Sequence, residues 1–137
     1  MKLSIHPFLI LFLTLGAGIA AQAQSEESTD KKEAAVENYS WALEHGSVEL
    51  QASTLYNLVR FYQAFPDAPQ KQVIPQLKQI SYEGANEQIR YRAYLTLMAL
   101  QHPELAEGLA FNNYEQSVSH YDSVAQRIHN RMLVENF

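Results

Sequence analysis

The chain has 137 residues, no cysteine and a net charge of −5 at pH 7. The absence of cysteine excludes disulfides, thiol catalysis, thiolate zinc sites and iron–sulfur clusters. Because an acidic chain repels phosphate backbones, we do not expect a nucleic-acid partner.

The N-terminal residues 1–23 have the features of a cleaved signal peptide. Lys2 supplies a positive charge, residues 7–20 are mostly apolar, and residues 21–23 read Ala-Gln-Ala, a small-x-small peptidase pattern. The alternative is a retained membrane anchor, but the apolar run is short for a span of about 20 residues. We therefore expect cleavage after Ala23, no stable membrane insertion afterwards, and a periplasmic or secreted mature protein. Loss of Lys2 leaves 9 basic and 15 acidic residues, which makes the net charge −6.

The mature chain is predicted to begin with a disordered lead-in, residues 24–29, which are polar, small and acidic. Asp30 followed by Glu33 resembles a capping box, so a helix should run from there to Glu44. We expect Gly46 to end this helix, since glycine most easily takes the left-handed C-terminal conformation.

Two further helices and their breaks follow. Ser47 can cap a helix over 48–65, and a turn with two prolines, residues 66–69, must end it. The next helix, residues 70–81, contains Pro75, which either kinks the helix or marks its first turn.

The second half of the chain is also helical by its spacing. Asn86 can cap a helix that ends at His102-Pro103, and residues 104–111 form a short helix or turn. An apolar stripe with spacings of 3 and 4 then runs through residues 111–133: Phe111, Tyr114, Val118, Tyr121, Ala125, Ile128 and Met132. The sequence contains no strand candidate, so we predict an all-α protein whose single domain covers residues 30–137.

Two stretches of the chain match each other 39 residues apart. Ser47 to Phe61 aligns with Asn86 to Leu100, and a two-residue slip then aligns Pro66 with Pro103. A period near 40 with helical spacing is typical of paired-helix solenoids. The tetratricopeptide period of 34 fits this match less well.

The second copy, with Asn86, Ile89-Arg90 and Ala93, resembles a HEAT repeat. That family usually has aspartate where this chain has Asn86, and pairs it with the arginine. The resemblance implies a short α-solenoid of about two HEAT-like helix pairs, residues 35–109, flanked by N- and C-terminal capping helices. It also implies surface recognition of a protein or peptide partner without catalysis.

The C-terminal helix, residues 111–133, allows two interpretations. Its apolar stripe can dock on its own domain, or it can form a coiled-coil seam in a homodimer. Val124 widens the apolar face beyond one partner helix, and the flanking charges are poorly paired, which favours docking on the domain.

The only local basic and aromatic cluster consists of Arg90, Tyr91, Arg92 and Tyr94. Alternate residues of a helix cannot all face the core, so one arginine and one tyrosine should reach the surface. There they can contact a peptide or an anion, since arginine and tyrosine are favoured interface anchors. In the structural alternative Arg90 bridges to a neighbouring helix and the tyrosine ring packs with its hydroxyl in water.

The sequence shows no catalytic or metal-binding pattern. His120 and His129 are nine residues apart on one helix and point to different sides, and no other histidine pair has ligand spacing. Neither a nucleophile elbow, a phosphate loop nor a metalloprotease motif occurs. We expect a non-enzymatic protein without metal or cofactor that binds a partner in the bacterial envelope or outside the cell.

Overall fold

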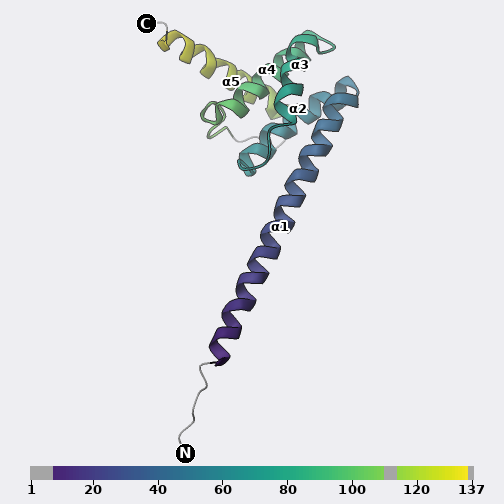
Figure 1. Cartoon of the computed structure of the whole chain (residues 1–137). Coiled ribbons are helices and arrows are strands. Elements are labelled where there is room, and N and C mark those ends of the chain that lie inside the picture. Colours follow the sequence, from purple (N-terminus) through teal and green to yellow (C-terminus); the bar gives the residue numbers. More distant parts are fainter. Residues whose placement is uncertain (1–7, 110–113, 136–137) are drawn as a thin grey trace, which may run out of the picture.

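A computed structural model describes residues 8–109 and 114–135 of the chain (Figure 1). Within these ranges it consists of five α-helices and one 3-10 helix, with no strand, so the all-α prediction is confirmed. The elements are α1 (Phe8–His45), α2 (Val48–Ala64), α3 (Val73–Glu83), α4 (Glu87–Gln101), η1 (Pro103–Leu105) and α5 (Tyr114–Glu135). No helix in the described part of the chain is both long and apolar enough to cross a membrane.

The first helix differs from its prediction. Residues 24–29 belong to α1 and are not an irregular lead-in, and Asp30 lies inside the helix and not at its cap. The sequence from 24 to 45 contains neither proline nor glycine, so nothing interrupts the helix. Contacts one turn apart support it, including an ion pair of 2.7 Å between Lys31 and Glu27. The N-terminal part of α1 projects beyond the other helices (Figure 1).

The caps of α2 and α4 are the predicted ones. The Ser47 hydroxyl accepts a hydrogen bond of 3.2 Å from the Leu50 N–H. The Asn86 side-chain oxygen accepts one of 2.8 Å from the Ile89 N–H. Each bond satisfies an N–H group that the first turn of a helix leaves unpaired.

The two helices also end alike. Phe65 and His102 both have φ −131°, with ψ 71° and 75°, and each N–H bonds the carbonyl four residues back at 2.8 Å. Both residues precede a proline, whose ring disfavours helical backbone in the residue before it. Matching local chemistry therefore ends both copies at the residue before the aligned prolines.

Pro75 is the third residue of α3, so it lies in the first turn and does not kink the helix. Proline fits there because the first N–H groups of a helix have no carbonyl partner within it.

The helices pair from α1 onward, whereas the prediction treated the first helix as a separate cap. α1 packs on α2 and α3 packs on α4, and these two hairpins adjoin through α1 with α3 and α2 with α4. The consecutive α2 and α3 make no comparable contact in the described residues. The short links at residues 46–47 and 84–86 fold neighbouring helices directly together, whereas the long link 65–72 separates α2 from α3. α1 is thus half of a hairpin and not a separate cap, and a repeat solenoid stays a prediction.

Gly46 and Gly84 allow the close hairpin links by lacking a side chain. Neither has a positive φ, so the expected left-handed end of α1 at Gly46 is wrong. A Cβ on Gly84 would lie 2.6 Å from the Ile80 carbonyl oxygen, and one on Gly46 would overlap the Ala42 carbonyl oxygen. The reason for glycine at both links is close approach of the preceding helix end.

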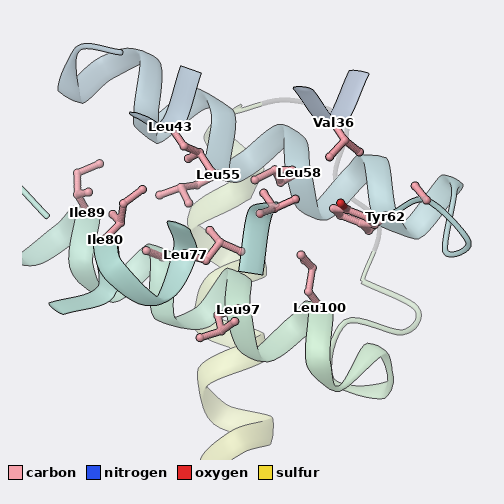
Figure 2. Close-up of a cluster of buried hydrophobic side chains, with 13 residues drawn as sticks. Val36, Leu43, Leu55, Leu58, Tyr62, Leu77, Ile80, Ile89, Leu97 and Leu100 are labelled. Carbon is pink, nitrogen blue, oxygen red and sulfur yellow. The ribbon is translucent and has the colours of Figure 1, made fainter. Parts of the chain in front are cut away.

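The main hydrophobic core lies between the two hairpins. Figure 2 shows its side chains converging from α1, α2, α3 and α4: Val36, Leu43, Leu55, Leu58, Tyr62, Leu77, Ile80, Ile89, Leu97 and Leu100.

The long link of residues 65–72 is attached to this core, because the Tyr62 hydroxyl donates a 2.7 Å hydrogen bond to the Pro69 carbonyl. Burial raises the pKa of Tyr62 to about 12. Lys32 of α1 forms an ion pair of 2.7 Å with Asp67 in the same link.

The centre of α5 docks on its own domain. Tyr121, Val124 and Ile128 are buried in a second cluster with Leu95 of α4 and Leu105 of η1. Val118 and Met132, which lie in the predicted stripe on either side of this buried centre, are half exposed. Phe111, the predicted start of this stripe, lies outside the described residues.

Arg127 connects α5 by hydrogen bonds to the turn that follows α4. Its Nη1 donates to the carbonyls of Leu105 at 3.1 Å and Glu107 at 2.8 Å. One charged donor thereby pairs two carbonyls of a turn, which fixes the position of the helix against η1.

The leucines of α2 provide a matched test of this core. Leu58 is fully buried and Leu50 is 41% exposed. We expect Leu58→Ala to lower the free energy of unfolding by about 2–5 kcal/mol, because it leaves a cavity among packed side chains. Leu50→Ala should cost below about 1 kcal/mol. Denaturant unfolding followed by circular dichroism measures both, and equal losses would contradict the assigned core.

Candidate functional site

An open groove of about 760 Å³ lies between the C-terminal end of α3 and the first half of α4. Its lining combines aromatic rings with a few polar groups: Ser81, Tyr82, Glu87, Gln88, Arg90, Tyr91 and Tyr94. We call this the tyrosine groove. Three of the four residues in the predicted cluster line it.

Helical spacing explains the α4 side of the groove. Glu87, Tyr91 and Tyr94 are four and three residues apart, so they share one face of α4. Tyr91 is 51% and Tyr94 39% exposed. Both tyrosines of the cluster therefore reach the surface, where one was expected.

Tyr82, from α3, is the aromatic groove residue outside the predicted cluster. It is 83% exposed, the highest exposure among the large apolar side chains described. It comes beside α4 because the link of residues 84–86 joins the last turn of α3 directly to the first turn of α4. The usable signal was a tyrosine just before a Glu-Gly break, in a position off the apolar stripe of 73, 77 and 80.

Arg90 is held at the base of the groove. Its Nη1 donates a 2.9 Å hydrogen bond to the Gly84 carbonyl at the end of α3. Its stem also packs on that glycine, since a Cβ there would lie 3.2 Å from the Arg90 Cγ. The carbonyl end of a helix carries partial negative charge, which stabilises the guanidinium in this place. This contact is a bridge from Arg90 to a neighbouring helix, as the structural alternative expected.

Arg92 is not part of the groove. It is 8% exposed, and its guanidinium carbon lies 5.8 Å from the centroid of the Tyr121 ring on α5. Two residues along a helix rotate a side chain by about 200°, so Arg90 and Arg92 face opposite sides of α4. A cation over an aromatic face is attracted to it, so Arg92 contributes to docking α5. The expectation that Arg92 contributes to a surface cluster is wrong.

The four histidines in the described part of the chain lie at separate places in the fold. His120 is buried and His129 is exposed on the same helix, as their spacing predicts. His45 is the last residue of α1 and stacks on Trp41 with ring centroids 5.3 Å apart, and His102 is the C-cap of α4. Among the described residues, no group of three histidine, aspartate or glutamate side chains is placed to hold a metal ion.

Burial lowers the pKa of His120 to about 4, and the nearby positive charge of Arg127 acts in the same direction. The rings of His120 and Tyr121 form a T-shaped pair with centroids 5.8 Å apart. A buried histidine with a lowered pKa folds in its neutral form, so protonation favours the unfolded state.

The lowered pKa of His120 predicts that acid destabilises the folded protein. The unfolded chain binds a proton at a pKa near 6.5, so the contribution of neutral His120 is complete above that pH and is lost as the pH falls towards about 4. We expect a loss of about 3 kcal/mol at most across this range. His120→Gln should flatten the pH dependence of the unfolding free energy, whereas His129→Gln, on the same helix but exposed, should leave it unchanged. An unaltered slope in His120→Gln would contradict the assignment.

Comparison of the chain with protein-family models, with curated proteins and with solved structures found no match in any of the three.

Proposed function

We propose that this chain is an exported, non-catalytic helical module that binds a segment of a protein or peptide partner in the tyrosine groove. The observation that carries the proposal is the gathering of three exposed tyrosines from two helices around one open groove. Tyrosine presents a large apolar ring with a polar tip and loses little conformational entropy on binding, so it is a frequent anchor of interfaces.

The support of the groove suits this role. Its two walls are neighbouring helices of one hairpin, and the Arg90 hydrogen bond to the Gly84 carbonyl connects them. A site on packed helices loses less freedom when a ligand binds than a site on a loop does. Its open form suits an extended segment of a larger partner better than an enclosed small molecule.

Export is part of the same proposal and depends on the signal-peptide pattern of residues 1–23. If the pattern directs export, the N-terminal sequence of the processed protein begins at Gln24. If protein recovered from outside the cytoplasm still contains residues 1–23, the predicted cleavage is wrong. The HEAT-like character of the scaffold is likewise proposed, on the shared spacing and caps of α2 and α4.

A peptide library displayed on phage and selected on the protein of residues 24–137 tests the binding function. We expect selected peptides to lose about tenfold in affinity on Tyr91→Ala, and a similar amount on Tyr82→Ala, because each removes an anchor ring. Trp41→Ala is the matched control, since Trp41 is an exposed aromatic residue on α1 away from the groove. Selected peptides that depend on Trp41 and tolerate both tyrosine changes would contradict the proposed site.

The alternative function is self-association through the C-terminal helix, residues 111–133. Exposed apolar side chains near its end, Leu133 and Val134, favour it. Light scattering should then show a molar mass that rises with concentration and returns to the monomer value in Leu133→Glu. A monomer at all concentrations would remove this alternative.

A further inference from the structure

We propose that the tyrosine groove recognises a basic side chain, lysine or arginine, of the bound segment, with the Tyr91 ring and the Glu87 carboxylate as its direct contacts. This inference rests on the proposed function and gives it a chemical specificity. It follows from the charged groups and the exposed tyrosine rings that line the groove.

The groove offers one available anion. Glu87 is exposed, and it forms no ion pair within the described part of the chain. It lies four positions before Tyr91 on the same face of α4, a spacing that places two Cβ atoms about 5–6 Å apart. A cation resting on the ring of Tyr91 would therefore be within reach of this carboxylate.

The other charge of the groove, Arg90, is already engaged. Its guanidinium donates to the Gly84 carbonyl, and its stem is packed on the same glycine. The negative end of the α3 helix offsets its charge. Arg90 thus has a structural role at the base of the groove. Glu87 and the tyrosine rings are the groups that determine which ligand binds.

The rings strengthen this preference. The face of a tyrosine ring is electron-rich and attracts ammonium and guanidinium groups. Tyr82, Tyr91 and Tyr94 supply three such rings around one groove. The net charge of −6 on residues 24–137 also draws cationic partners towards the surface and repels acidic ones.

Three blocked heptapeptides that differ only at the central residue test the inference. The sequence is Gly-Ser-Gly-X-Gly-Ser-Gly, where X is lysine, its uncharged isostere norleucine, or glutamate. NMR titration of the 15N-labelled protein of residues 24–137 gives each dissociation constant and locates the site. We expect the lysine peptide to bind about fivefold tighter than the norleucine peptide, with shifts at Tyr82 and along residues 87–94. The glutamate peptide should bind weakest.

Matched variants distinguish a specific binding site from attraction by the overall net charge. Glu87→Gln and Glu37→Gln each remove one exposed carboxylate, so the net charge changes equally. We expect Glu87→Gln to weaken the lysine peptide about threefold and Glu37→Gln to leave it unchanged. Tyr91→Phe should keep the affinity, whereas Tyr91→Leu should lower it about threefold, because leucine has no ring face.

The outcomes distinguish this inference from the function on which it rests. Equal binding of the lysine and norleucine peptides, or equal effects of the two glutamate changes, overturns the basic-side-chain inference. If library peptides without lysine or arginine still depend on Tyr82 and Tyr91, the binding function stands and only the specificity fails. If none of the library peptides depends on these tyrosines, both fail.

Discussion

The burial of α4 on nearly all sides is the constraint on which the rest of the structure depends. One side of this helix joins the core with α1, α2 and α3 through residues such as Ile89 and Leu97. Another joins the cluster with α5 and η1 through Leu95, and the hydroxyl of Thr96 lies 3.1 Å from that of Tyr121. The strip that includes Glu87, Tyr91 and Tyr94 is left to face solvent. The surface available for recognition is therefore what remains after the packing of α4 is satisfied.

Local chemistry made much of the fold predictable. Ser47 and Asn86 as caps, and the prolines that end α2 and α4, act through contacts within a few residues, so sequence alone locates them. The docking of α5 by Tyr121, Val124 and Ile128 also follows from the width of its apolar face. These features do not depend on which other helices are nearby.

What the sequence did not predict depends on contacts between distant segments. The pairing of α1 with α2 and α3 with α4 follows from link lengths and from glycines whose role is steric, which periodicity does not reveal. Arg92 resembles Arg90 in sequence, but the position of α5 decides that it is buried. Tyr82 joins the site only because the end of α3 lies beside α4. The candidate site was thus predictable along one helix and not across two.

Gly84 lies at the link between α3 and α4, beside the groove and not in its lining. A methyl group there would meet the Ile80 carbonyl oxygen, the Ile89 side chain and the Arg90 stem at once, at 2.6, 3.1 and 3.2 Å. Because Ile89 and Arg90 belong to α4, a side chain at this position would press on the start of that helix as well as on the last turn of α3. The absence of a side chain at Gly84 thus allows the end of α3 and the start of α4 to approach closely, with Tyr82 and Tyr91 on either side of one groove.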